Sequence, residues 1–206
     1  MAYRRTKLMQ QRLADNRQNI VKAARGLVAK GGFRAAQVAA VAKEAELSIG
    51  AIYKYFPSKT DLFIETLRDA VRNEVAILDR IADTSESSAK RLHDAVESFA
   101  RRALEGPYLA YAFIAEPADA RVEAARMRAR RAFGEVFERI VREGIRRGEF
   151  PEQNLDVTAA CIVGAFTEAL IGPVAPTARK VGDVDKLVKE ICGFCVRAVG
   201  GKPATG

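Results

Sequence analysis

The chain has 206 residues, 49% of them apolar, and can form one large domain or two small ones. It shows no apolar run near the roughly 20 residues of a membrane span and no secretory signal. The sequence therefore predicts a cytoplasmic protein without a membrane partner. The formal net charge of +8 is unevenly placed, because residues 1–60 hold 12 Lys/Arg and 3 Asp/Glu whereas residues 61–206 hold 22 and 23. The excess positive charge therefore does not serve only to keep the whole surface soluble. Its position indicates that only the first 60 residues contact a polyanion.

The basic unit begins with residues 1–12, which read as a flexible basic arm or a frayed helix start. A first helix is predicted from Asp15 or Asn16 to about Lys30, where apolar residues recur at helical spacing. Gly31-Gly32 ends it, since glycine adopts the left-handed stop conformation at little cost.

Two shorter helices follow, one over residues 37–45 and one over residues 49–55. The turn between them lies at Glu46-Leu47, and Ser48 is a good N-cap for the second. Three short helices of which the last two are joined by a tight turn predict a helix-turn-helix, whose third helix enters the DNA major groove.

Long helices fill the rest of the chain. Pro57-Ser58 opens a fourth helix that can reach Ile81, with Ser58 and Asp61 at capping-box-like spacing. Glycine and proline breaks then delimit helices over residues 89–105, 107–116, 119–147, 154–171 and 183–199, with a break at 172–176 and a disordered tail over 200–206. No alternating strand pattern is visible, so the predicted fold class is all-α with about nine helices.

The segment from Ile20 to Leu62 resembles the TetR family of bacterial transcriptional regulators. The resemblance is carried by Ala23-Ala24, Gly32-Phe33, Val38, Val41-Ala42, Ala45, Leu47-Ser48, Gly50, Ile52-Tyr53, Tyr55-Phe56, Ser58-Lys59 and Leu62. It covers about a quarter of the chain. It implies a DNA-binding domain over residues 1–60 and an effector-binding and dimerisation domain over residues 61–206.

The predicted partner of the first domain is double-stranded DNA. Tyr53 and Tyr55 can donate phenolic hydrogen bonds to phosphates, although each can also be a core aromatic. Ile49, Gly50 and Ala51 offer no side-chain donor, which favours readout by apolar contact and DNA shape. The full predicted interface is Arg34, Gln37, Ser48, Ile49, Gly50, Ala51, Tyr53, Lys54, Tyr55, Lys59 and Thr60.

Two positions depart from the family pattern. Ala36 stands where a threonine often opens the second helix, which removes a hydroxyl contact. Glu46 stands where the turn usually has glycine, and a left-handed backbone there costs about 1 kcal/mol without glycine.

The resemblance further implies a small-molecule effector, with no cofactor or metal, and a homodimer formed through the last two helices. An apolar stripe of Val184, Leu187, Val188, Ile191, Cys195 and Ala198 fits the dimer, or alternatively an internal core. We expect Cys161, Cys192 and Cys195 to be buried free thiols. The predicted effector contacts are His93, Phe99, Tyr108, Tyr111, Phe113, Phe133, Phe137 and Phe166.

An arginine-rich run over residues 121–131 is either a solvated face or an attractor for an acidic effector. The sequence as a whole predicts a homodimeric repressor that an effector releases from a palindromic operator. The alternative is a DNA-binding activator or nucleoid-associated protein without an effector. An enzyme is disfavoured, because the sequence shows no Ser-His-Asp order, no paired metal ligands and no phosphate-binding loop. Its single histidine also leaves few side chains for acid–base catalysis near neutral pH.

Overall fold

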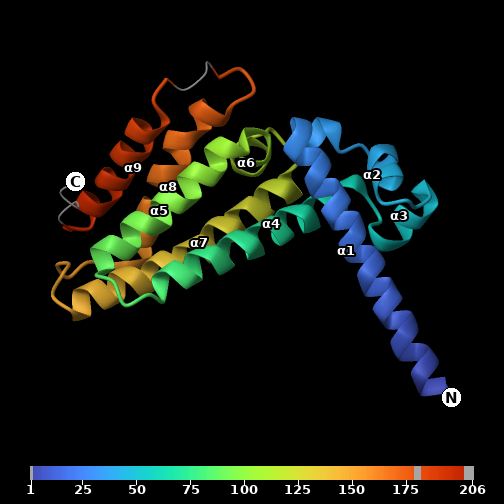
Figure 1. Ribbon diagram of the computed structural model, residues 1–206, viewed down its shortest axis with the longest axis horizontal. Coiled ribbons are helices and arrows are strands. Elements are labelled where there is room, and N and C mark those ends of the chain that lie inside the picture. The colour runs from blue at the N-terminus through green and yellow to red at the C-terminus, as the bar shows by residue number, and fades with distance from the viewer. Residues whose placement is uncertain (1, 179–181, 202–206) are drawn as a thin grey trace.

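A computed structural model describes residues 2–178 and 182–201, and within these residues every regular element is an α-helix (Figure 1). The predicted all-α class is therefore confirmed. Of the disordered tail predicted over residues 200–206, residues 202–206 lie outside the described residues. Gly200 and Gly201 are described, and their N–H groups donate to the Arg197 and Val196 carbonyls at 2.9 and 3.0 Å, so the prediction was wrong for these two. The helices are α1 (Ala2–Ala35), α2 (Val38–Glu44), α3 (Ile49–Tyr55), α4 (Lys59–Ala82), α5 (Ser88–Glu105), α6 (Pro107–Ile114), α7 (Ala120–Arg146), α8 (Leu155–Val174) and α9 (Val184–Ala198).

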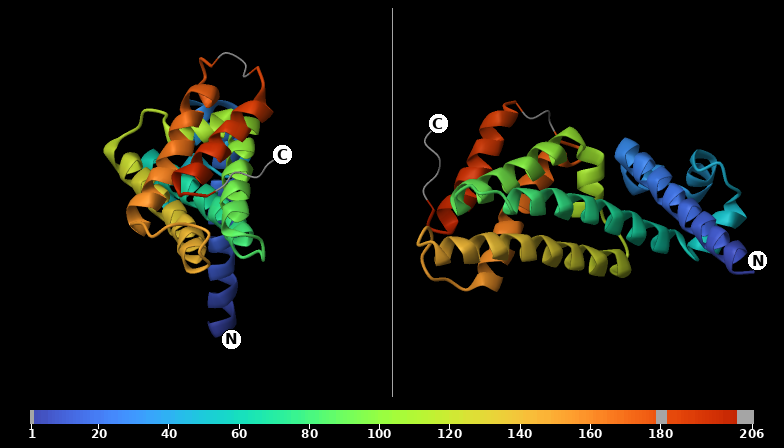
Figure 2. Two further views of the ribbon diagram at one scale, coloured as in Figure 1. Left: turned by 90° about the vertical axis from the view of Figure 1, so that its left-hand side faces the viewer. Right: turned by 60° about the horizontal axis from the view of Figure 1, so that its bottom comes forward.

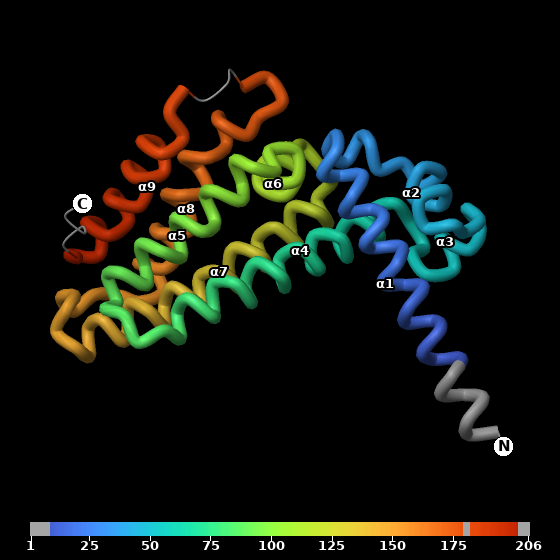
Figure 3. The backbone as a smooth tube through the Cα atoms, viewed as in Figure 1, coloured from blue at the N-terminus to red at the C-terminus, as the bar shows by residue number. Residues whose placement is uncertain are grey.

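The first three helices form a small group at one end of the molecule (Figures 1 and 3). α1 begins well before the predicted start at Asp15 or Asn16, but it is kinked at Gly31 and Gly32 as expected, with Gly32 at φ 69°. The core side chains of this three-helix group, among them Ile20 and Val28 of α1 and Ile52 of α3, are almost fully buried. This core continues past residue 60 into Leu62 and Leu67 of α4, so the small group is fixed to the larger part of the chain.

α4 and α7 lie side by side along much of their length and connect the two ends of the molecule (Figures 1 and 2). Ser58 caps α4: its hydroxyl oxygen accepts a hydrogen bond from the Asp61 backbone N–H at 3.1 Å and the hydroxyl donates to the Asp61 carboxylate at 2.6 Å. The predicted capping spacing is thus present, with the carboxylate bound to the serine hydroxyl. The cap lies three residues after the end of α3 at Tyr55 and fixes the start of α4.

The far end is a bundle of α5, α7, α8 and α9 around a second core. α8 is long and apolar enough to cross a membrane by length and composition alone, so the expectation that no apolar run nears 20 residues was wrong. Burial of Ile162, Phe166 and Leu170 inside the bundle accounts for that composition. α8 also runs through the start of the predicted break to Val174, with Pro173 inside its last turn.

The apolar stripe of α9 faces the protein's own core. Val188, Ile191 and Cys195 are at most 7% exposed and pack within the second core, so they are unavailable to a partner. Their assignment to a dimer interface was therefore wrong, and the internal alternative holds for them. Val184 and Phe194 remain exposed on this helix, at 39% and 55%.

Candidate nucleic-acid interface and effector cavity

α3 presents one face to the core and the other to solvent. Ile52 is 1% exposed, whereas Ile49 and Tyr53 are 49% and 47% exposed. The Ser48 hydroxyl oxygen accepts from the Ala51 N–H at 3.1 Å and so closes the first turn. A Cβ added at Gly50 would meet nothing within 4 Å, which leaves this turn open to a large ligand such as DNA. Tyr53 is therefore free for a phosphate, and its core alternative does not hold.

The turn before α3 has the strained backbone expected from the sequence. Glu46 adopts φ 56°, the left-handed region that glycine would occupy at no cost. The Asn19 side-chain amide of α1 donates to the Ala45 carbonyl at 3.1 Å, which holds the turn against α1. Ala36 is fully buried, so a threonine hydroxyl at this position would need a partner inside the core.

Polar side chains flank α3 at both ends of its open face. The Tyr55 hydroxyl accepts a hydrogen bond from Asn16 at 3.1 Å, which orients the phenol and leaves its proton free to donate. Lys59 donates to the Gln37 side-chain oxygen at 3.1 Å, and the Gln37 amide donates to the Arg34 carbonyl at 2.9 Å. These contacts join Arg34 at the end of α1, Gln37 just before α2 and Lys59 at the start of α4.

Thr60 is the exception among the predicted DNA contacts. Its hydroxyl donates to the Asp119 carboxylate at 2.6 Å, and Asp119 also caps α7. Next to it, Asp61 is paired with Arg121. Hydrogen bonds from Ser58 and Arg121 lower the pKa of Asp61. The pKa of Asp119 is lowered mainly by the hydrogen bond from Thr60. The start of α4 is therefore bonded to the start of α7 by the Thr60–Asp119 hydrogen bond and the Asp61–Arg121 ion pair. The sequence predicted neither interaction.

A cavity of about 130 Å³ lies between α4, α5, α6 and α7. Its walls are mostly apolar, with a polar edge where the Arg102 guanidinium binds the Glu74 carboxylate at 2.7 and 3.0 Å. Buried among its lining residues is Arg126, which is 4% exposed. Burial lowers the pKa of Arg126, and the nearby Glu123 and Glu116 oppose this effect. A pocket of this kind suits a small apolar molecule with a polar group.

Of the predicted effector contacts, three phenylalanines line this cavity, namely Phe99, Phe113 and Phe133. The other predicted residues are not among those that line it. Phe137 and Phe166 are fully buried with ring centroids 5.5 Å apart and belong to the second core. Tyr111 packs against that core, and Tyr108 is 45% exposed.

Two family models match this chain in succession. One, described as bacterial regulatory proteins of the tetR family, matches residues 20–66, and one described as a Tetracyclin repressor-like C-terminal domain matches residues 85–170. The chain belongs to the TetR family. The first match covers the helix-turn-helix and its fastening to α4, and the second covers most of the bundle and the cavity.

Curated relatives of this TetR-family protein resemble it over part of their length. It is 33% identical over 95 residues to the HTH-type transcriptional repressor KstR of Mycolicibacterium smegmatis, which covers 46% of this chain and 47% of that protein. It is 42% identical over 53 residues to KstR of Rhodococcus jostii, covering 26% and 25%. The chain thus spans less than half the length of the curated relatives it matches.

Solved structures share the fold over nearly the whole chain. RolR in complex with resorcinol has a TM-score of 0.73 and 22% identity, covering 95% of this chain and 92% of that one. FadR from Bacillus subtilis in complex with stearoyl-CoA has a TM-score of 0.75 and 20% identity, covering 88% and 98%. At these identities the likeness establishes the fold.

The arginine run of α7 in this TetR-family chain is not one continuous solvated face. Arg121 is paired with Asp61, and Arg126 is buried against the cavity. The Arg131 side chain is 85% exposed, and its Nε lies as far as 3.9 Å from the Glu135 carboxylate. This long, exposed ion pair fits the alternative of a solvated face. The helix therefore divides its arginines between an inter-helix ion pair, a cavity wall and solvent.

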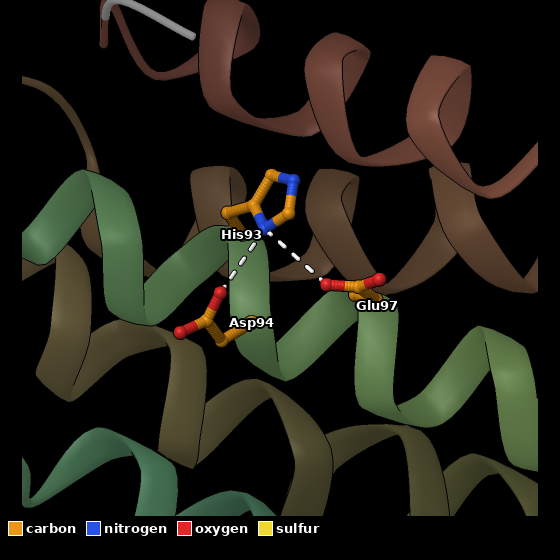
Figure 4. Close-up of side chains that lie close together, drawn as sticks. All are labelled: His93, Asp94 and Glu97. Atoms are coloured by element: carbon orange, nitrogen blue, oxygen red, sulfur yellow. Dashed lines mark hydrogen bonds and ion pairs between the residues drawn. The ribbon is translucent and has the colours of Figure 1, made fainter. Parts of the chain in front are cut away.

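His93 lies away from the cavity, on α5, where Asp94 and Glu97 approach it (Figure 4). Its Nδ1 is 3.1 Å from the Asp94 carboxylate and 3.8 Å from that of Glu97. The sequence offered a signal for this group, the i, i+4 spacing of His93 and Glu97, but we expected no metal ligand here. Lys90 and Arg101 bind the other oxygens of Asp94 and Glu97 and balance their charges, so the cluster is self-contained.

Proposed function

We propose that this TetR-family protein is a homodimeric repressor that acts in the cytoplasm and leaves a palindromic operator when a small molecule fills the cavity. The observation that carries the proposal is the open face of α3. Ile49 and Tyr53 stand exposed on it, and Tyr55 and Lys59 flank it with oriented donors. Such an arrangement suits a recognition helix in the major groove with phosphate contacts at both ends.

A homodimer follows from the operator and from the surface of α8. Two recognition helices are needed for two half-sites one helical turn apart. α8 exposes Val157 at 59%, together with the small side chains of Ala160 and Cys161. The expectation that the Cys161 thiol is buried was therefore wrong, whereas Cys192 and Cys195 are buried as expected. Small residues allow close approach of a second helix, and the exposed Phe194 of α9 adds an aromatic anchor. We place the dimer interface on these exposed residues.

A path of contacts leads from the cavity to the DNA-binding domain. Arg126 lines the cavity, and its Nη2 donates to the Glu116 backbone carbonyl. The Glu116 carboxylate in turn accepts from the Phe33 N–H at 3.0 Å, at the kink of α1. Thr60 and Asp119 form a second link at the start of α4. A ligand that displaces α6 or α7 therefore acts on the DNA-binding domain at the kink of α1 and at the start of α4.

Structures of the same fold support a ligand-responsive role. RolR was solved with resorcinol and FadR with stearoyl-CoA, so this arrangement of helices accepts small molecules of quite different size. The curated KstR relatives are transcriptional repressors. If effector and operator binding are coupled, each must weaken the other by the same factor.

The test uses DNA selected from a random-sequence pool by the wild-type protein. Tyr55→Phe removes one hydroxyl, and Lys59→Ala removes one charge. The double variant is expected to bind the selected DNA at least about tenfold more weakly, and the loss of the lysine should reduce the salt slope by about one. Lys186→Ala on α9, which is exposed and far from α3 in Figure 1, is the matched control.

Unchanged affinity of the double variant would overturn the assigned interface. Wild-type protein that selects no sequence, and binds all DNA with a steep salt dependence, would favour a nucleoid-associated role instead.

A further inference from the structure

We infer that the cavity between α4 and α7 binds a one-ring aromatic molecule with an anionic acceptor group, such as an aromatic carboxylate, whose oxygen accepts a hydrogen bond from Arg126 Nε. This inference rests on the proposed function, because it names the chemical class of the effector. It follows from the size of the cavity, from one unpartnered buried donor and from the charge of the wall.

The size limits the ligand to about one ring. A cavity of about 150 Å³ lined by aliphatic and aromatic side chains can hold a benzene molecule. The cavity here measures about 130 Å³, and Phe99, Phe113 and Phe133 supply aromatic walls. Rings favour offset or edge-to-face contacts with such walls. A long acyl chain would have to extend beyond this cavity.

Arg126 provides the polar anchor. Its Nη1 donates to the Glu123 carboxylate, and its Nη2 donates to the Ala112 carbonyl at 2.6 Å and to the Glu116 carbonyl. Its Nε is buried and has no hydrogen-bond partner in the described chain. This atom is closed off from the cavity as it stands, so a ligand oxygen reaches it only when a neighbouring side chain shifts. A ligand that does so removes the cost of a buried donor without a partner.

The other polar groups of the wall are already occupied. The Thr167 hydroxyl donates to the Val163 carbonyl at 2.6 Å, and Glu74 is bound by Arg102. Glu74 pairs with Arg102 and Glu123 pairs with Arg126, so among the three guanidinium groups of the lining only that of the exposed Arg130 pairs with no carboxylate of the described residues. The wall therefore carries net positive charge, which favours an anion over a cation of the same shape.

The experiment compares three ligands of one shape on the full chain by calorimetry: benzoate, benzyl alcohol and benzamidine. Benzoate should bind at least about tenfold more tightly than benzyl alcohol, and benzamidine should show no binding. Equal binding of all three, or preference for the cation, would overturn the inference.

Two variants assign the binding to this site. Arg126→Lys keeps a charge but loses the Nε donor, and it should lose benzoate affinity at least about tenfold. Arg91→Lys is the matched control, because Arg91 is also a buried arginine whose Nε lacks a partner, yet it lies outside the cavity. If Arg126→Lys does not fold, Ala129→Leu narrows the cavity from a half-buried lining position and should also abolish binding. Full benzoate affinity in the Ala129→Leu variant would overturn the inference.

A parallel measurement of DNA release separates this inference from the proposed function. Benzoate that binds without weakening the DNA complex would support the ligand class and contradict effector control. Release of DNA by a long-chain acyl-CoA, with no benzoate binding, would overturn the ligand class while the repressor proposal stands.

Discussion

Arg25 of α1 places Nη1 2.9 Å from the Asp69 carboxylate of α4, and Asp69 is only 6% exposed. Gln18 of the same helix donates to this carboxylate at 3.3 Å. Arg17, about two turns before Arg25, binds the Glu65 carboxylate at 3.1 Å, and Glu65 is 8% exposed. α1 is thus tied to α4 by two buried acids, so the DNA-binding domain is expected to move with α4 as one body.

Arg25→Ala should destabilise the protein because it strips the closest cation from a buried carboxylate. The Arg25 side chain is 34% exposed, so water replaces part of the interaction and we expect a loss of about 1–2 kcal/mol in the free energy of unfolding. Urea denaturation measures it. Arg80→Ala replaces an exposed arginine of α4 and is the control. An equal loss of stability in both variants would contradict a stabilising ion pair between Arg25 and the buried Asp69.

Glu65 predicts a dependence of stability on acid. Burial opposes its ionisation most, but the hydrogen bond from Arg17 and the charges of Arg17, Arg72 and Arg68 together outweigh burial and hold the pKa of Glu65 below its ordinary 4.5. Because the unfolded chain binds the proton first, this stabilisation is present above pH 4.5 and is lost as the pH falls through the lowered pKa.

The free energy of unfolding of the wild type should therefore fall more steeply below pH 4.5 than that of Glu65→Gln. Chemical denaturation at a series of pH values compares the two, with the exposed Glu152→Gln as control. Parallel curves for the wild type and Glu65→Gln would refute the role of this ion pair.

Local signals predicted the helix-turn-helix in detail, while burial between helices was harder to assign. α3 has the predicted ends because the Ser48 cap and the Pro57 break are encoded within a few residues of it. The α9 stripe was misassigned because an apolar face looks the same whether it meets α5 of its own chain or a second copy. The links of Thr60 and Asp61 to α7 join residues about 60 positions apart, and no local pattern marks them.

Gly32 and Gly26 of α1 form a matched pair for the kink. Gly32 has φ 69°, and a Cβ there would lie 2.8 Å from the Glu116 carboxylate. Gly32→Ala should cost about 1–2 kcal/mol and disturb the contact of Glu116 with Phe33. Gly26→Ala meets nothing within 4 Å and should stabilise the helix by about 0.5–1 kcal/mol. Thermal and urea unfolding measure both, and effects of the same sign would refute the strained kink.

The thiols of Cys192 and Cys195 should be inert in the native protein. Burial raises the pKa of Cys192 to about 12, with a smaller contribution from Glu97, and burial raises the pKa of Cys195 to about 11. The thiolate is the reactive form, so little is present at neutral pH. In a Cys161→Ser background, a thiol-specific dye should label no cysteine in buffer and two in denaturant. Rapid labelling in buffer would show that α9 opens from the bundle.

Phe194 tests the proposed dimer surface independently of the misassigned stripe. It is 55% exposed in the protomer, so Phe194→Glu should leave protomer stability almost unchanged. In a two-fold interface the ring is buried twice, and each burial contributes about 1.5–3 kcal/mol, so the dimer dissociation constant should rise at least about tenfold. Sedimentation at several concentrations measures it. Lys189→Glu, exposed on the same helix, is the control for added charge. Operator binding should weaken in step with dimer loss, and a Phe194→Glu protein that remains a tight dimer would place the interface elsewhere.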